Sequence, residues 1–286
     1  MTAETHTITT PGAEITYDVR PGAGPALLLV GSPMDATGFG TLAGHFADRK
    51  VITYDPRGVG RSKLTGGQSV TTPEEHADDL SRVIDAVGGG PVDVFASSGG
   101  AVNALALVAA HPDQVGTLVA HEPPTIPVLP DRENASAATK GIAELYQRAG
   151  MGPAMVKFIL MTSHKGEVPP GWIDQPGPGP ADFGLPTEDD GSRGDVLLEQ
   201  NLISCTHYEP DFAALRAAST RIVIGVGEES ADELAHRGGE GVAAGLGIEP
   251  VQFPSHHGGF LGGEYGQQGD PDNFAATLRK VLDEQA

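Results

Sequence analysis

The segment Pro91 to Ala110, PVDVFASSGGAVNALALVAA, constrains this chain more than any other. An apolar run over residues 92–96 is followed directly by two serines and two glycines, and then by an Ala- and Leu-rich stretch with helix-forming composition. This pattern predicts a strand that turns sharply into a helix, with a serine hydroxyl presented at the turn as a nucleophile.

Steric limits on such a turn decide between its two serines. The backbone at the turn is strained, so the residues two before and two after the nucleophile have to be small. Around Ser98 these positions are Ala96 and Gly100, whereas around Ser97 the earlier position would be Phe95. The sequence therefore predicts Ser98 as the nucleophile.

Strand and helix patterns alternate on both sides of this turn. Eight strands are expected, at residues 6–10, 14–19, 26–30, 50–54, 92–96, 116–120, 221–226 and 250–253, the first two as an edge hairpin. Helices are expected around 39–46, over 72–87, after the serine turn, over 231–246 and over 270–284. The alternation predicts an α/β fold with a mostly parallel eight-stranded sheet, covered by helices on both faces.

The strand pattern stops between Pro123 and about Cys205. Helices are expected at 131–148, 153–163 and 195–205, while the Pro-, Gly- and acid-rich residues 167–195 predict a long mobile loop. We expect a helical cap here, inserted between two strands of the sheet. The predicted domains are a core in two parts, residues 1–124 and 206–286, around a cap at residues 125–205.

Charge and composition limit the partners of the chain. Its 286 residues include 38 acidic and 18 basic side chains, a formal net charge of -20, which disfavours nucleic acid and anionic membranes as partners. No signal segment is visible, the most apolar run, 101–110, is too short to span a bilayer, and the single cysteine suits a reducing compartment. We expect a cytoplasmic protein with a small-molecule substrate, and the sequence leaves a homo-oligomer open.

Several stretches together resemble the α/β-hydrolase superfamily over nearly the full length of the chain. They read LLLVGSP, YDPRGVGRS, VFASSGGAVNALAL, HEPP and PSHHGGF, and the second is familiar from capped members. The resemblance implies the α/β-hydrolase fold with an inserted cap. It also implies a serine hydrolase, a carboxylic ester hydrolase that cleaves a small uncharged ester or lactone through an acyl-enzyme on Ser98. Amide or carbon–carbon bond hydrolysis uses the same triad and stays open.

A base has to activate the serine, because a free hydroxyl is a weak nucleophile at neutral pH. The superfamily places this histidine in the loop after the last strand, which here is Ser255 to Phe260. The resemblance to a Pro-x-x-His-x-Gly-Phe pattern selects His257, with His256, one residue away, as the alternative.

The acid of the triad departs from the commonest pattern. Many members carry it in a Gly-x-x-Asp turn after the strand that here reads RIVIGV, but this chain has Ser230 at the aspartate position. Other members carry the acid at the end of the strand that follows the nucleophile helix, which selects Glu122, with Glu229 as second choice. Both preserve the chain order serine, acid, histidine. A Glu122 that merely caps the turn before Pro123 is the plainer interpretation.

The oxyanion hole is expected from two backbone N–H groups. The first belongs to Gly99, directly after the nucleophile. The second should come from the loop after the third strand, where relatives often have His-Gly-x. This chain has Val30-Gly31-Ser32 there, so the usual histidine is absent and Ser32 is the positional match. Met34 is a candidate for lining the substrate pocket, although methionine at such a place more often serves packing.

Neither metal nor cofactor is expected. The histidines lack metal-ligand spacing, the Gly-rich turn lacks the lysine of a phosphate-binding loop, and no dinucleotide fingerprint occurs. Two alternative functions stay open: a cofactor-free perhydrolase or haloperoxidase-type enzyme, and a non-hydrolytic ligand-binding or cyclase/isomerase member of the same fold.

Overall fold

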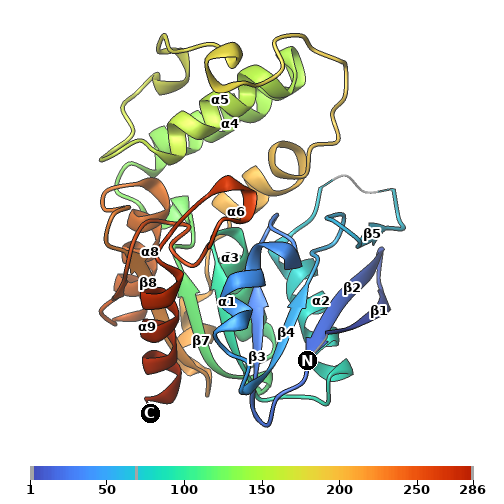
Figure 1. Ribbon diagram of the computed structural model, residues 1–286. Helices are drawn as coiled ribbons and strands as arrows, with labels where there is room; N and C mark the ends of the chain where they lie inside the picture. Colours follow the sequence, from blue (N-terminus) through green and yellow to red (C-terminus); the bar gives the residue numbers. More distant parts are fainter. Residues whose placement is uncertain (1–2, 68–69, 285–286) are drawn as a thin grey trace.

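One mixed sheet runs through the computed structural model, which describes residues 3–67 and 70–284 (Figure 1). Its main path has eight strands in the order β1-β2-β4-β3-β6-β7-β8-β9, and a two-residue strand, β5 (Lys63–Leu64), pairs with β2 beside this path. The strands are β1 (Glu4–Thr10), β2 (Ala13–Arg20), β3 (Gly24–Val30), β4 (Arg49–Tyr54), β6 (Val92–Ser97), β7 (Val115–His121), β8 (Arg221–Gly227) and β9 (Val251–Phe253).

Strand direction follows the expected pattern. The β1–β2 and β2–β4 pairs are antiparallel, and the pairs β4–β3, β3–β6, β6–β7, β7–β8 and β8–β9 are parallel. The predicted mostly parallel sheet with an edge hairpin is confirmed. Because the strands are parallel, the carboxyl ends of β3, β6, β7, β8 and β9 meet at the same edge of the sheet.

Helices cover both faces because successive strand residues point to opposite sides. On β3, Leu28 and Val30 pack with α2 (Pro73–Ala86), α3 (Gly99–Ala110) and α8 (Leu234–Leu246). Leu27 and Leu29 pack on the other side with the helices α1 (Gly40–Gly44) and α9 (Pro271–Asp283).

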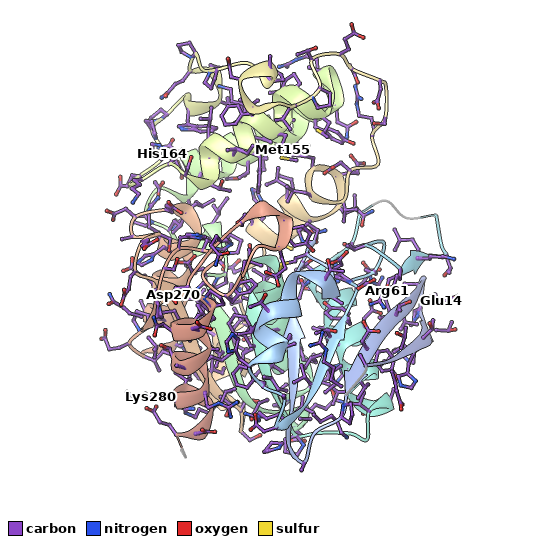
Figure 2. All side chains as sticks on the ribbon, in the orientation of Figure 1. Glu14, Arg61, Met155, His164, Asp270 and Lys280 are labelled. Carbon is purple, nitrogen blue, oxygen red and sulfur yellow. The ribbon has the colours of Figure 1, made fainter. Side chains whose placement is uncertain are left out.

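Local signals fix where several helices begin and end. Thr72 Oγ1 accepts from the N–H of Glu75, whose carboxylate accepts from the N–H of Thr72, so α2 starts with a reciprocal cap. The carboxylate of Asp270 caps α9 and Lys280 lies in its last turn, which complements the helix dipole (Figure 2). The helix expected around 39–46 is shorter than predicted, because a 3₁₀ turn occupies Ala36–Phe39.

The segment between β7 and β8 contains no strand in residues 122–220, all of which the structure describes. The helices α4 (Arg132–Ala149) and α5 (Met151–Thr162) stand beyond the carboxyl edge of the sheet (Figure 1). They pack on each other through a separate hydrophobic cluster that includes Ile142, Tyr146 and Trp172. The predicted boundaries of the core and the cap stay predictions, and the outermost residues of the core ranges lie outside the described residues.

The return from this segment to β8 is irregular. A π-helix, Val196–Asn201, runs into α6 (Leu202–Thr206), and α7 (Phe212–Ala217), which was not predicted, precedes β8. Within the loop at 167–195 the buried Trp172 starts a short 3₁₀ turn. The mobility expected of this loop stays a prediction. No helix in the described ranges is both long and apolar enough to cross a membrane.

Candidate active site

The turn between β6 and α3 holds Ser98 in an unusual backbone conformation, with φ 58° and ψ -127°. Such a conformation costs of order 1–3 kcal/mol for a residue other than glycine and clusters at functional sites. Ser98 directly precedes α3, yet its hydroxyl caps no N–H group of the helix. Ser98 thus stands at the carboxyl end of β6, and its hydroxyl is not engaged in capping the helix.

Close packing explains the small residues around Ser98. Ala96 is fully buried, and a Cβ on Gly100 would lie 2.4 Å from the carbonyl oxygen of Val30. A Cβ on Gly99 would lie 2.6 Å from the carbonyl oxygen of Ser32. The two predicted oxyanion donors, Gly99 and Ser32, thus lie on adjacent segments, and the N–H of Gly99 opens α3, where it has no partner inside the helix.

Asn201, at the end of the π-helix, holds the side chain of Ser32. Its Oδ1 accepts from Ser32 Oγ at 2.8 Å and from Cys205 Sγ at 3.6 Å, and its Nδ2 donates to the carbonyl of Val196 at 3.0 Å. Ser32 and Asn201 are 5% and 3% exposed, so this contact is shielded from water. Sequence reasoning missed Asn201, because nothing in the pattern of residues 195–205 signals a π-helix.

Met34 packs within its own loop. It is half-buried, borders the core on the α1 and α9 side of the sheet, and lies so close to Gly31 and Gly38 that a Cβ there would meet it at 2.9 and 2.4 Å. Its expected place in the wall of a substrate pocket stays a prediction.

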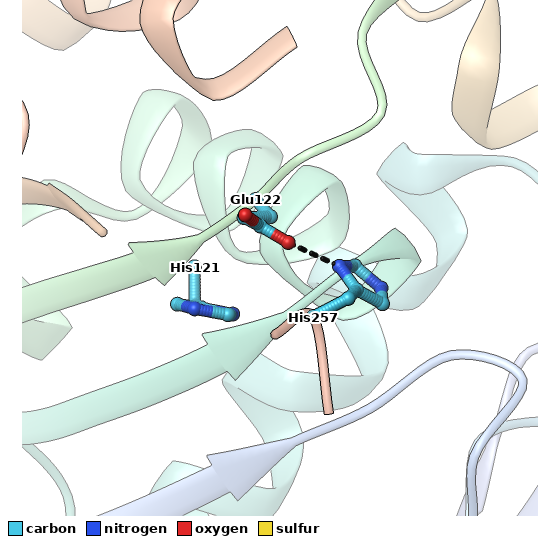
Figure 3. Close-up of side chains that lie close together, drawn as sticks. All are labelled: His121, Glu122 and His257. Atoms are coloured by element: carbon cyan, nitrogen blue, oxygen red, sulfur yellow. Dashed lines mark hydrogen bonds and ion pairs between the residues drawn. The ribbon is translucent and has the colours of Figure 1, made fainter. Parts of the chain in front are cut away.

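Glu122 and His257 are joined by a direct hydrogen bond (Figure 3). Glu122 follows β7 with φ 48°, is fully buried, and its Oε2 accepts from Nδ1 of His257 at 2.5 Å. The side chain of His257 is 38% exposed, and its Nε2 has no hydrogen-bond partner among the described residues. An imidazole fixed at Nδ1 and free at Nε2 is what a general base of a serine nucleophile requires.

The ionisation of Glu122 is set by opposing effects. Burial raises the pKa of this carboxyl, but hydrogen bonds from His236 and His257, together with the electrostatic effect of the neighbouring histidines, outweigh burial and hold the pKa well below its ordinary value. Glu122 is therefore a carboxylate at neutral pH, able to stabilise an imidazolium at position 257.

The alternative histidine, His256, and the alternative acid, Glu229, make hydrogen bonds to other groups. Nε2 of His256 lies 3.2 Å from the carbonyl oxygen of Gln268, and its Nδ1 accepts from the N–H of Gly258. Glu229 is exposed, and its carboxylate accepts from Ser255 Oγ at 3.5 Å. Of the residues considered, the structure joins His257 to Glu122 and leaves His256 and Glu229 apart from them.

Ser98 and His257 are not hydrogen-bonded in the described part of the chain. Catalytic hydrogen bonds are often long before substrate binds and tighten in the complex. The roles of Ser98, His257 and Glu122, and of the two oxyanion donors, therefore stay predictions.

The second oxygen of Glu122 is held by the end of β8 and the residues after it. Oε1 accepts from the N–H of Gly227 at 2.8 Å and from the hydroxyl of Ser230, and Nδ1 of His236 lies 3.4 Å away. The sequence pattern identified Ser230 only as a missing aspartate, and no pattern signalled His236.

His121 lies beside this pair and raises the question of a metal site. Ligand atoms of His121, Glu122 and His257 lie within 4.8 Å of one another. Both oxygens of Glu122 already accept hydrogen bonds, and the ring of His121 packs edge-on against Phe253 and Phe274, with neither nitrogen hydrogen-bonded. Burial lowers the pKa of His121 to about 4. The arrangement suits acid–base chemistry, and the expectation of no metal stays a prediction.

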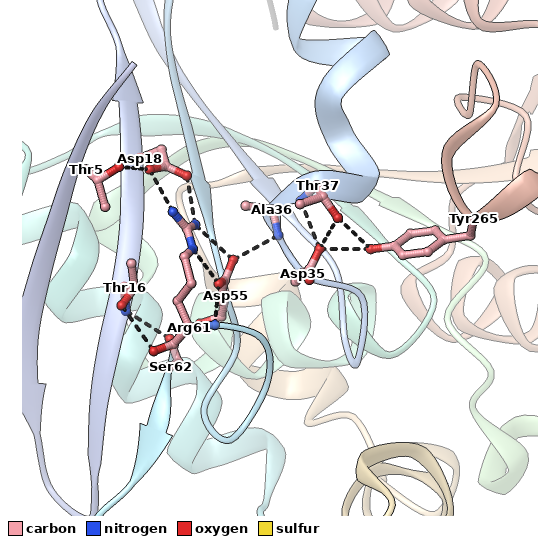
Figure 4. A network of polar contacts seen from close by, with 10 residues as sticks. All are labelled: Thr5, Thr16, Asp18, Asp35, Ala36, Thr37, Asp55, Arg61, Ser62 and Tyr265. Carbon is pink, nitrogen blue, oxygen red and sulfur yellow. Dashed lines mark hydrogen bonds and ion pairs between the residues drawn. The ribbon is translucent and has the colours of Figure 1, made fainter. Parts of the chain in front are cut away.

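The loop that carries Ser32 is braced on the β4 side by Asp55 (Figure 4). Asp55 Oδ1 accepts from the N–H of Ala36 at 3.1 Å, and Oδ2 accepts from Nε of Arg61 at 2.7 Å. Arg61 also contacts Asp18 on β2 at 2.8 Å. Burial raises the pKa of Asp55, but the hydrogen bonds from Arg61 and Ala36 lower it by more than burial raises it. The pKa of Asp55 is therefore below its ordinary value.

The same loop is held on its other side by Tyr265, which lies between β9 and α9 on the connection that also carries His257. The hydroxyl of Tyr265 donates to Asp35 Oδ1 at 2.8 Å, and Thr37 donates its N–H to the same oxygen at 2.9 Å (Figure 4). The segments that carry the predicted oxyanion donor and the predicted base are therefore tied to each other directly.

Comparisons with known proteins agree with this architecture. Residues 28–149 match the family described as alpha/beta hydrolase fold. The uncharacterized hydrolase YraK of Bacillus subtilis (strain 168) is 31% identical over 266 residues, which cover 91% of this chain and 92% of that protein.

Two solved structures share the fold over almost their whole length. A thermophilic esterase from Thermogutta terrifontis, with malate bound, has 21% identity and a TM-score of 0.64, covering 99% of this chain and 98% of that one. A hydrolase from Pseudomonas aeruginosa has 19% identity and a TM-score of 0.66, covering 98% of each chain.

Proposed function

Since the chain belongs to the alpha/beta hydrolase fold family and is a hydrolase of that fold, we propose that it is a serine hydrolase acting on a small uncharged ester or lactone. The observation that carries this proposal is the hydrogen bond between Glu122 and His257, which leaves Nε2 of His257 free at the sheet edge where Ser98 stands. A carboxylate, an imidazole and a serine hydroxyl in this order are the parts of an acyl-transfer site.

The proposed reaction proceeds in two halves. Ser98 Oγ attacks the substrate carbonyl while His257 Nε2 takes its proton, and His257 then gives that proton to the departing alkoxide. Water attacks the resulting acyl-serine with His257 again as base, and His257 passes that proton to Ser98 Oγ as the bond to the acyl group breaks and the acid leaves. Glu122 remains ionised throughout and stabilises the imidazolium through Nδ1.

Negative charge that develops on the carbonyl oxygen needs donors in place before the reaction. We assign this role to the backbone N–H groups of Gly99 and Ser32, whose segments are adjacent. One donor of this kind typically contributes about 10²–10³-fold to turnover. The bracing of the Ser32 loop by Asp55 and Tyr265 supports this assignment, because a preorganised donor does not have to be reoriented during the reaction.

An uncharged substrate fits the electrostatics of the chain. With a formal net charge of -20, the protein repels anionic substrates at long range. Within residues 3–67 and 70–284, the hydrogen-bond partners of Glu122 and His257 include no lysine or arginine that could pair with a substrate carboxylate.

A fluorophosphonate probe and short p-nitrophenyl esters test the proposal. The folded wild type should be labelled and should hydrolyse the esters, Ser98→Ala should lose both properties, and Ser97→Ala is the matched control that should keep them. An unlabelled and inactive wild type, or labelling that survives Ser98→Ala, would overturn it. Added hydrogen peroxide separates the perhydrolase alternative, because that activity would form peracid in place of the free acid.

A further inference from the structure

A fully buried carboxylate such as Glu122 needs partners for both of its oxygens. Only Oε2 faces His257, and the side chain reaches it from a backbone with φ 48° at the end of β7. Nothing in that hydrogen bond alone determines the rotation of the carboxylate about its last torsion. The groups around Oε1 therefore decide whether Oε2 stays aimed at Nδ1 of His257.

The groups at Oε1 come from the last residue of β8 and from the residues that follow this strand. The N–H of Gly227 donates at 2.8 Å, the hydroxyl of Ser230 donates as well, and Nδ1 of His236 lies 3.4 Å away. The N–H of Gly227 is fixed by the backbone. His236 has a competing acceptor, the carbonyl of Gly227, at 3.1 Å. Ser230 is therefore the side chain that makes the closest contact to this oxygen.

Ser230 is itself firmly placed. It is fully buried, its carbonyl accepts from the N–H of Glu233 at 3.0 Å, and its Oγ lies 3.2 Å from the carbonyl of Gly227. A Cβ on Gly227 would lie 2.6 Å from Ser230 Oγ, so the absence of a side chain at 227 makes room for the hydroxyl. In a Gly-x-x-Asp pattern this turn would carry an aspartate at position 230. Here Ser230 occupies that position, and its hydroxyl donates to Glu122, which follows the neighbouring strand β7.

We propose that Ser230 is a positioning residue, whose hydroxyl fixes Oε1 of Glu122 so that Oε2 remains aligned with Nδ1 of His257. The proposal rests on the proposed function for its effect on turnover, but the alignment itself is a property of the resting protein. The hydroxyl of Ser230 contacts Glu122 and the carbonyl of Gly227, so Ser230 acts through Glu122.

Three measurements on Ser230→Ala and on the near-isosteric Ser230→Cys test the proposal, with the exposed Ser219→Ala, before β8, as matched control. We expect kcat for p-nitrophenyl esters to fall about tenfold to a hundredfold, the effect of losing a hydrogen bond to a charged group, with KM within about twofold. The rate of fluorophosphonate labelling of Ser98 should fall by the same factor. The low-field NMR resonance of the His257 Nδ1 proton should shift or broaden in both variants and not in the control.

The NMR measurement separates this proposal from the proposed function. A wild type that is inactive but shows the low-field resonance would refute the serine-hydrolase activity and still test the alignment. Unchanged kcat and an unchanged resonance in folded Ser230→Ala or Ser230→Cys would overturn the positioning role. A loss of kcat in Ser219→Ala equal to that in the Ser230 variants would also overturn it. Circular dichroism and thermal unfolding establish that each variant is folded, and Ser230→Cys fills the site if the alanine variant does not fold.

Discussion

Nδ1 of His257 and Oε2 of Glu122 lie 2.5 Å apart although 135 positions separate the two residues in the chain. The parallel sheet brings them together, because β7 pairs with β8 and β8 with β9, so Glu122 and the loop that carries His257 both follow carboxyl ends of strands. In the described residues, positive φ values outside glycine occur at five positions, and Ser98 and Glu122 are two of them. The strained residues Ser98 and Glu122 and the Glu122–His257 hydrogen bond thus all lie at the carboxyl edge of the sheet.

Glu122→Gln should reduce kcat for ester hydrolysis by about 10³–10⁴-fold, because the amide neither holds the required tautomer nor stabilises the imidazolium. Glu229→Gln is the matched control and should leave kcat nearly unchanged, since Glu229 is exposed and contacts Ser255 rather than either histidine. Steady-state kinetics on p-nitrophenyl esters decide the matter. A normal Glu122→Gln beside an inactive Glu229→Gln would reverse the assignment.

Asn201→Ala should lower both stability and turnover, because it removes the acceptor of the Ser32 hydroxyl. Ser32 is only 5% exposed, so water cannot easily replace that acceptor. We expect a loss of about 1–3 kcal/mol in the free energy of unfolding, the penalty of one buried unsatisfied polar group. A double-mutant cycle with Ser32→Ala, which keeps the backbone N–H, isolates the pair. Strictly additive effects in urea unfolding and in kcat would show that the contact does not matter.

The free energy of unfolding should decrease as the pH falls from about 6.5 to about 4, with His121 as one identifiable cause. The unfolded chain protonates His121 near pH 6.5, whereas burial keeps it neutral in the folded protein down to a pKa of about 4. The unfolded state therefore binds the extra proton in this window, and stability is lost as the pH drops.

His121→Phe should remove roughly 3 kcal/mol of this pH dependence, since one pKa unit corresponds to about 1.4 kcal/mol. A phenyl ring suits the site, where Phe253 and Phe274 surround His121 and neither of its nitrogens is hydrogen-bonded. Urea unfolding at several pH values measures the change, with His6→Phe on the edge strand as control. An unaltered pH slope in His121→Phe would refute this explanation.

Arg61→Ala should destabilise the protein by about 2 kcal/mol, because it strips the closest cation from the buried Asp55. Arg193→Ala, which breaks an exposed pair with Asp189, is the comparison and should change stability much less, because water and salt screen an exposed ion pair. Thermal unfolding gives both values. Equal effects of the two variants would mean that Asp55 does not depend on Arg61.

The sheet and the serine turn were predictable because they depend on short-range patterns. Continuous apolar runs indicated parallel strands, and the small Ala96 and Gly100 selected Ser98. The role of Glu122 could be predicted only from a family resemblance. Its left-handed backbone conformation and its hydrogen-bond partners depend on residues far away in the sequence, which no short-range pattern indicates. For the same reason Ser230 looked like the loss of an acid, and the helix expected from residue 231 begins at Leu234 after a turn that Ser230 starts.

The contact between Ser32 and Asn201 also bears on how such a protein could be re-engineered or could diverge. Replacing residues 125–205 with the corresponding segment of a relative would remove Asn201. The buried hydroxyl of Ser32 would then face a different residue of the new segment. A chimera would therefore have to transplant the pair together, or substitute position 32 at the same time. Residue 32 and the segment 125–205 are therefore constrained to change together.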